Sequence, residues 1–165
     1  MVLQKAMVLT VIIISILIIT NPLSSTELKV LAGNGEAGFV DGTGVEARFN
    51  KPIRLSPFGP GKILVADIYN HAIREVSIEG KVMTLAGSPE NKGHHDGLAA
   101  EAKFNAPHGV AVSSDGLIAV ADASNHVIRL LTPVKNNGYN VTTIAGVVGQ
   151  TGLQDGEAQI GRAHV

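Results

Sequence analysis

The sequence predicts an all-β fold built from four-stranded antiparallel units, and three observations support this. Residues 49–74 align without a gap with residues 104–129, and the copies share Phe-Asn, Pro, Ile-x-Val-Ala-Asp, Asn-His and Ile-Arg. A strand ending in Ala-Gly recurs at residues 28–33, 82–87 and 141–146. The chain contains 19 glycines and only 16% charged residues, which suits many short strands joined by tight turns. Repeats of this length, each long enough for four strands, are typical of a β-propeller.

Residues 1–25 are predicted to be a signal peptide or a short membrane anchor. Lys5 precedes an apolar run over residues 6–19, which ends before Asn21-Pro22. A secretory signal combines a basic start with an apolar stretch of about 7–15 residues, whereas a spanning helix needs about 20. We therefore expect export and cleavage, which gives a secreted, periplasmic or other extracytoplasmic location. A retained leader would leave the protein anchored to the membrane.

Residues 26–159 are predicted to form a propeller fragment of about two blades, with repeats at residues 49–87 and 104–146. In each repeat the apolar pattern indicates four strands, and the Val-x-Thr-Leu/Ile-Ala-Gly strand is expected to be the fourth and outermost. The other expected strands are 53–56, 62–67 and 72–77 in the first repeat and 109–113, 117–122 and 126–132 in the second. The N-terminal copy of the outer strand has no three strands before it. We expect it to complete the last blade of a closed ring.

A second repeated feature, Asp-Gly followed by Glu-Ala-x-Phe, joins the blades at residues 41–49 and 96–104. We expect a short helical turn, with Asp near its N-terminus accepting amide hydrogens and with Ala and Phe facing inward. Asp155-Gly-Glu-Ala begins a third copy near residue 155, but Ala163 stands where Phe is expected. Residues 160–165 match the translation of a common sequencing adapter. We interpret them as adapter read-through and expect the natural protein to continue.

The Asn-His-x-Ile-Arg motif at residues 70–74 and 125–129 resembles the NHL repeat, because Val-Ala-Asp precedes it and Val-x-Thr-Leu/Ile-Ala-Gly follows it. The resemblance covers about residues 28–159. It implies an NHL/TolB-like propeller that is six-bladed when complete. The family includes protein-interaction modules, sensor domains of membrane kinases, RNA binders and a metal-dependent amidating lyase, so the fold alone does not choose a function.

The repeated polar residues are predicted to be structural. His71 and His126 occupy the same place in successive blades, at a turn between two strands, where we expect a satisfied hydrogen-bond network. Asn70 and Asn125 are expected to adopt the left-handed turn conformation that Asn tolerates. The complete set is Asp67, Asn70, His71 and Arg74 in the first repeat and Asp122, Asn125, His126 and Arg129 in the second.

Three other histidines are candidates for chemistry. His108 is a candidate general base or metal ligand, because it starts an inner strand and is not part of the repeat. His94 and His95, in a Gly-rich connection, are further candidate metal ligands, although solvated side chains are the default there. These residues alone do not define a metal site, and no cofactor is predicted. A divalent metal is expected only if the protein is an enzyme, which is the alternative described below.

The composition restricts the partners. Lys and Arg number 13 against 14 Asp and Glu, and only 4% of residues are aromatic, which argues against a nucleic-acid partner. The absence of cysteine excludes disulfides and thiolate metal sites. We expect a binding or scaffold module for a protein, peptide or carbohydrate, with membrane contact only through residues 1–25. The alternative is a metal-dependent propeller enzyme, of lyase or lactonase type, with its site in the central channel.

Overall fold

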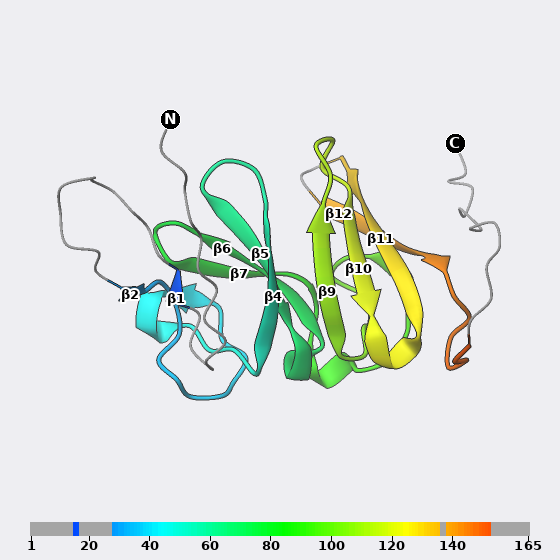
Figure 1. Cartoon of the computed structure of the whole chain (residues 1–165), viewed down its shortest axis with the longest axis horizontal. Coiled ribbons are helices and arrows are strands. Elements are labelled where there is room, and N and C mark those ends of the chain that lie inside the picture. Colours follow the sequence, from blue (N-terminus) through cyan, green and yellow to red (C-terminus); the bar gives the residue numbers. More distant parts are fainter. Residues whose placement is uncertain (1–14, 17–27, 136–137, 153–165) are drawn as a thin grey trace.

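The computed structural model describes residues 15–16, 28–135 and 138–152, and these residues form two five-stranded antiparallel sheets side by side (Figure 1). The first blade contains β3 (Gly42–Thr43), β4 (Pro52–Pro57), β5 (Lys62–Asp67), β6 (Ala72–Ser77) and β7 (Lys81–Gly87), in the order β3-β7-β6-β5-β4. The second contains β8 (Gly97–Leu98), β9 (Pro107–Val112), β10 (Ile118–Asp122), β11 (Val127–Val134) and β12 (Gly138–Ala145), in the order β8-β12-β11-β10-β9. The all-β, propeller-type fold predicted from the repeats is confirmed.

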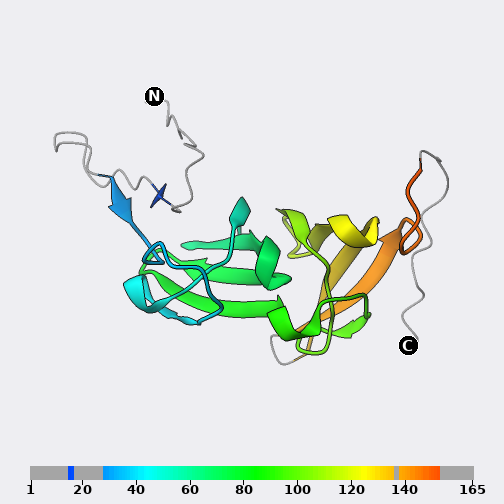
Figure 2. The ribbon, with the colours of Figure 1, turned by 90° about the horizontal axis from the view of Figure 1, so that it is seen from below.

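Short elements complete the described chain. β1 (Ser15–Ile16) pairs with β2 (Lys29–Val30). Four single 3-10 turns follow strands or connections: η1 (Gly44–Glu46), η2 (Ile68–Asn70), η3 (Pro89–Asn91) and η4 (Ala123–Asn125). Seen from below, η2 and η4 lie at the same end of their blades (Figure 2). In the part of the chain that the structure describes, no helix is long and apolar enough to cross a membrane. The predicted leader lies outside the described residues except at 15–16.

The outermost strand of each blade differs from the one that the sequence predicts. The Val-x-Thr-Leu/Ile-Ala-Gly strand is not outermost, because β3 pairs with β7 through Gly42 and Val82, and β8 pairs with β12 through Gly97 and Val141. Both added strands are two residues long and come from the connection between blades. A sequence pattern needs more residues than this to reveal a period of two.

The Asp-Gly connection also differs from the expected helix cap. η1 begins after Thr43, and no side chain caps it, so Asp41 does not bind the turn amides. In the second copy the chain forms a hydrogen-bonded turn instead, in which the Ala102 amide donates to the Leu98 carbonyl over 2.9 Å. The inward-facing residues are as expected: Ala47, Phe49, Ala102 and Phe104 are all buried.

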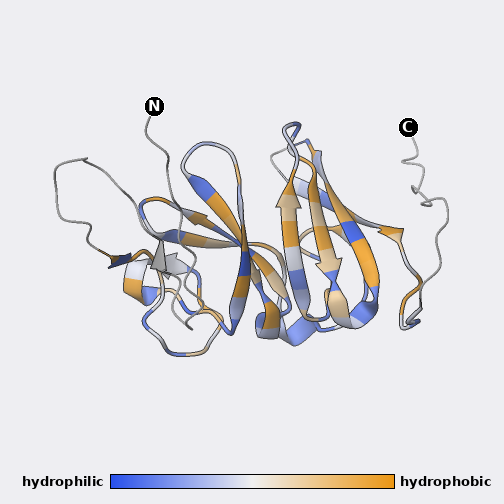
Figure 3. Cartoon of the chain, viewed as in Figure 1, coloured by the Kyte–Doolittle hydropathy of each residue, from blue (hydrophilic) through white to orange (hydrophobic). Residues whose placement is uncertain are grey.

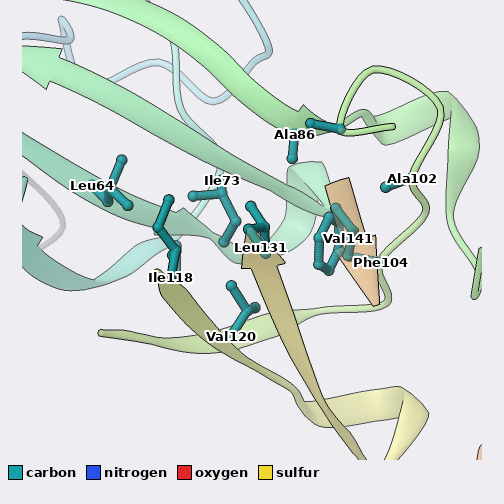
Figure 4. Close-up of a cluster of buried hydrophobic side chains, with 11 residues drawn as sticks. Leu64, Ile73, Ala86, Ala102, Phe104, Ile118, Val120, Leu131 and Val141 are labelled. Atoms are coloured by element: carbon teal, nitrogen blue, oxygen red, sulfur yellow. The ribbon is translucent and has the colours of Figure 1, made fainter. Parts of the chain in front are cut away.

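The core that joins the blades is built on alternating faces of the strands (Figure 4). Leu64, Ile73 and Ala86 of the first blade face Phe104 and other apolar side chains of the second. The second blade also contributes Ala99, Ala102, Ile118, Val120, Leu131 and Val141. β10 is apolar over most of its length (Figure 3), which fits a strand enclosed between neighbouring layers.

Gly87 is required where the blades meet. Its φ is +82°, and a Cβ there would collide with the carbonyl oxygen of His71 and lie 3.0 Å from the Phe104 ring. Gly146, at the same place in the second blade, has a φ of +88°. Only glycine adopts this backbone without strain, which explains why β7 ends in Ala-Gly and why glycine follows Ala145 at the end of β12.

Candidate functional site

The repeated polar residues form one buried network in each blade. Asp67, at the end of β5, accepts hydrogen bonds from the Asn50 amide at 2.7 Å, from Asn70 Nδ2 at 2.7 Å and from Arg74 Nη1 at 2.8 Å. Asp122 does the same at the end of β10, with Asn105, Asn125 and Arg129 at 2.7, 2.8 and 2.9 Å. The aspartate and arginine side chains are fully buried.

The arginines also hold the connection that enters their own blade. Arg74 donates to the carbonyl oxygens of Val40 and Arg48, and Arg129 donates to those of His95 and Lys103. The guanidinium carbons lie 5.1 Å from the Phe49 ring centre and 5.0 Å from the Phe104 ring centre. Both terminal nitrogens of each guanidinium are used for internal contacts, whereas the buried Nε of Arg74 has no hydrogen-bond partner. The geometry makes this network a structural clamp.

Asp41 and Asp96 are members of the network that the sequence analysis missed. Asp41 Oδ1 lies 2.7 Å from Arg74 Nη2, and Asp96 Oδ1 lies 2.6 Å from Arg129 Nη2. Each also accepts the amide hydrogen of a threonine at 3.0 Å, Thr84 on β7 or Thr143 on β12. The signal was present, because 33 residues separate the aspartate from the arginine in both copies.

The carboxylates titrate differently according to their surroundings. Partial burial opposes ionisation of Asp41, but the Thr84 amide and the Arg74 charge outweigh it and lower the pKa of Asp41. Burial likewise opposes ionisation of Asp96, but the Thr143 amide and the charge of Arg129 outweigh it and lower the pKa of Asp96. Full burial raises the pKa of Asp67, and the hydrogen bonds from Asn70 and the Asn50 amide and the charge of Arg74 reduce that rise. Asp41 and Asp96 therefore stabilise the fold above their usual titration range and lose that contribution in acid.

The turn histidines, rather than the asparagines, adopt the left-handed conformation. Asn70 and Asn125 end the 3-10 turns η2 and η4, while His71 and His126 follow with φ of 52° and 61°. The prediction for the asparagines was wrong because their side chains already bind the aspartates three residues earlier. Because the asparagine side chain completes the 3-10 turn, the chain reverses its direction at the histidine that follows.

His71 connects the two blades. Its Nδ1 accepts the Ala106 amide hydrogen over 3.0 Å, so this nitrogen carries no proton in the folded state. Partial burial, followed by the positive charge of Lys92, lowers the pKa of His71 from its ordinary value of 6.5, and Asp122 opposes the shift. His126 occupies the same place in the second blade and is exposed.

A pH dependence follows from His71. The unfolded chain binds a proton near the ordinary pKa of 6.5, while the folded chain binds it only at lower pH, so stability is expected to fall as the pH drops below about 6.5. His71→Asn, which also tolerates the left-handed backbone, should flatten this dependence between about pH 7 and pH 5. Urea unfolding at several pH values measures it, with His126→Asn as the matched control. An unchanged slope in His71→Asn would contradict the assignment.

The other histidines do not converge. His94 Nε2 lies 2.8 Å from Thr143 Oγ1 and 4.0 Å from Asp96, so its side chain is bound rather than solvated. His95 forms an isolated antiparallel bridge with Lys103 and offers its carbonyl to Arg129. His108 is exposed on β9. Within the described residues, no three His, Asp or Glu side chains are grouped to hold a metal ion.

The inner strands share an irregular start at the end of the blades where η2 and η4 lie. In β4 the register passes from Pro52 to Arg54 and skips Ile53, and in β9 it passes from Pro107 to Gly109 and skips His108. Such a bulge turns a side chain away from the sheet and is frequent near binding sites. Ile53 is 42% exposed, and β4 packs beside β9, which brings the two bulges to one edge (Figure 1).

Charged and aromatic side chains surround this edge. Lys51 Nζ donates to the Tyr69 hydroxyl over 3.1 Å and lies 4.8 Å from the centre of its ring. Tyr69 is 53% exposed, and Arg54, which follows Ile53 on β4, is exposed as well. In the part of the chain described by the structure, neither Lys51 nor Arg54 pairs with a carboxylate. We call Lys51, Ile53, Arg54, Tyr69 and His108 the rim surface.

The two sheets pack face to face, and each contains the same buried Asp–Asn–Arg clamp. This repeated arrangement defines a repeat protein of the β-propeller class. A model of the NHL repeat matches residues 104–129. Over 105 residues the chain is 31% identical to the chloroplastic protein SUPPRESSOR OF QUENCHING 1 of Arabidopsis thaliana, covering 63% of this chain and 10% of that protein. It is 36% identical over 86 residues to human NHL repeat-containing protein 2, covering 52% of this chain and 11% of that one. Residues 104–129 therefore form an NHL repeat, and the chain is similar to NHL repeat-containing proteins over about half its length.

Solved structures show the same fold. A protein of unknown function from Bacteroides thetaiotaomicron superposes with a TM-score of 0.60 and 22% identity, over 76% of this chain and 30% of that one. A protein described as an auxiliary nutrient binding protein from the same organism gives 0.54 and 22%, over 72% and 30%. The chain spans about a tenth of the length of the curated relatives and under a third of these structures.

Proposed function

We propose that this chain is part of an NHL-repeat binding module and that the rim surface recognises its ligand. The observation that carries the proposal is the contrast between the repeats. The clamp residues are identical in both copies, but the exposed positions at the bulged ends differ: Lys51, Ile53 and Tyr69 are replaced by Ala106, His108 and Ser124. A repeat scaffold adapts to one ligand when its buried residues stay the same from repeat to repeat and its exposed residues differ.

The chemistry of the rim surface favours a peptide or carbohydrate that carries an anionic group, presented alone or on a protein. Lys51 and Arg54 supply two positive charges without carboxylate partners among the described residues. Tyr69 supplies a half-exposed ring held in place by Lys51, and such a ring packs against the apolar face of a sugar or side chain. Recognition by several blades would follow if the ring has six of them, as the family resemblance implies. One structural neighbour is described as a nutrient binding protein, which is in line with a binding role.

We further propose that the module acts outside the cytoplasm, on the basis of the leader-like residues 1–25. Fusion of this segment to a reporter, followed by cell fractionation, tests the location. An exported reporter is expected, and a cytosolic reporter of unchanged mass would refute the proposal.

Binding is tested with immobilised full-length chain and a panel of acidic oligosaccharides, acidic peptides and their neutral counterparts. We expect binding to an acidic member, weakened at least about tenfold by Tyr69→Ala or Lys51→Ala, as for residues central to an interface. The control is Ile78→Ala, which changes an exposed side chain at the other end of β6. Binding that is equally sensitive to Ile78→Ala, or insensitive to both rim variants, would contradict the proposal.

A further inference from the structure

A short exposed loop before the first blade carries reactive groups that the proposed function does not use. It consists of Asn34, Gly35 and Glu36. Of the asparagines in the described part of the chain, Asn34 is the only one that glycine follows. No atom of the described residues, apart from those of its chain neighbours, lies within 4 Å of the place that a Cβ on Gly35 would take. No bulky group therefore blocks the approach of the Asn34 side chain to the Gly35 nitrogen.

Both polar atoms of the Asn34 side chain contact Glu36. Oδ1 accepts the main-chain amide hydrogen of Glu36 over 3.0 Å, and Nδ2 donates to Glu36 Oε2 over 3.2 Å. The amide hydrogen points at the oxygen on which negative charge develops when a nucleophile adds to Asn34 Cγ, so it stabilises that charge. The carboxylate lies beside the nitrogen that leaves in such a reaction and is placed to carry a proton to it.

The fold holds this loop in place from both ends. Gly33 and Gly38 flank the loop, and their amides donate to main-chain carbonyl oxygens of the connection that follows, over 2.9 and 3.0 Å. The Glu36 side chain is held as well, because its Oε2 lies 3.3 Å from Arg48 Nε. A free peptide of the loop lacks these contacts. The arrangement of the reactive groups therefore depends on the folded chain, and such positioning speeds a reaction between neighbouring groups.

We propose that Asn34 is a site of self-modification, at which the folded chain converts the side-chain amide into a carboxylate without an enzyme. The Gly35 nitrogen attacks Asn34 Cγ, so that a new C–N bond forms and the Cγ–Nδ2 bond breaks. The proton lost by the Gly35 nitrogen passes to Nδ2 through the Glu36 carboxylate, and ammonia leaves. The product is a cyclic imide, which water then opens at either carbonyl carbon to give aspartate or isoaspartate.

Other positions with related chemistry lack this combination of groups. Asp41 and Asp96 also precede glycine, but each carboxylate is held by an arginine of the clamp and by a threonine amide. Asn91 is exposed, but Lys92 follows it, and a side chain on the next residue hinders the attacking nitrogen. Within the described residues, Asn34 is the position that combines an amide, a following glycine and a neighbouring carboxylate.

The reaction is followed by peptide mapping of the full-length chain kept at neutral pH. A synthetic peptide of residues 28–40 is the reference, because it has the same local sequence without the connection that holds the loop. Mass spectrometry detects the exchange of the amide NH2 for OH, and isoaspartate is recognised by its resistance to a protease that cleaves before aspartate. We expect Asn34 to react at least about threefold faster in the folded chain than in the peptide. Asn91 should stay unmodified over the same time.

Glu36→Gln removes the carboxylate but keeps the main-chain amide, and it should slow the reaction at least about threefold. Glu90→Gln changes another exposed carboxylate and is the matched control, which should react at the rate of the parent chain. The comparison of the parent chain with the peptide does not depend on any variant. The proposal is overturned if the folded parent reacts no faster than the peptide, or if Glu36→Gln and Glu90→Gln react at the same rate.

Discussion

Replacing Arg74 by methionine is expected to lower the free energy of unfolding by about 3–5 kcal/mol, because it leaves a buried carboxylate without its partner. Arg74 and Asp67 are both fully buried and lie 2.8 Å apart. The substitution also removes the side-chain donors to the Val40 and Arg48 carbonyls, which then keep only the main-chain hydrogen bonds between these two residues. Methionine keeps much of the volume, so the loss reports the polar contacts.

Urea unfolding of Arg74→Met measures this effect. The matched control is Arg54→Met, in which an exposed arginine on β4 changes in the same way, and a change within about 0.5 kcal/mol is expected there. The corresponding substitution of Arg129 should resemble that of Arg74, since its contacts repeat. A loss below about 1 kcal/mol at both clamp positions would show that the network contributes little to stability.

Replacing Phe104 by alanine is expected to cost about 3–5 kcal/mol, as for other fully buried aromatic residues. Phe104 is 0% exposed and contacts both blades: Ile73, Ala86 and Gly87 on one side and its own sheet on the other. The cavity would open at the joint between the sheets. We therefore expect the two blades to unfold in separate transitions, so that they lose protection from hydrogen exchange at different denaturant concentrations.

Phe58→Ala is the control for this substitution. Phe58 is only partly buried, at the periphery of the same core, where its ring centre lies 6.4 Å from that of Tyr139. A smaller loss and a single transition are expected. If Phe104→Ala also unfolds in one step with a loss similar to that of Phe58→Ala, Phe104 is not what couples the blades.

Much of the fold could be predicted because the chain repeats itself. Two copies with the same Phe, Asp and Arg positions identify the strands and the buried side chains without any single motif being decisive. β3 and β8 could not be predicted, since two residues of Gly-Thr or Gly-Leu carry no strand pattern. They exist because Asp41 and Asp96 hold the connection against β7 and β12, and that is a tertiary contact.

The candidate site was predicted less completely. His108 was identified as an unusual inner residue, and the structure adds that it stands at a bulge equivalent to that of Ile53. The pair of Lys51 and Tyr69 was missed because 18 residues separate the two positions in sequence. The link between His71 and Ala106 was missed for the same reason, as nothing in a local pattern indicates which amide of the next blade reaches an imidazole.

The clamps hold the entering connections mainly by their main chain. Arg74 binds the carbonyls of residues 40 and 48, Asn70 binds that of Gly38, and the second blade uses residues 93, 95 and 103 in the same way. A carbonyl oxygen is the same whichever side chain stands beside it. Many side chains of these connections are therefore free to change while the path of the chain is kept. New sequences grafted into them should inherit the backbone trace, which makes the connections natural places for engineering an additional binding loop.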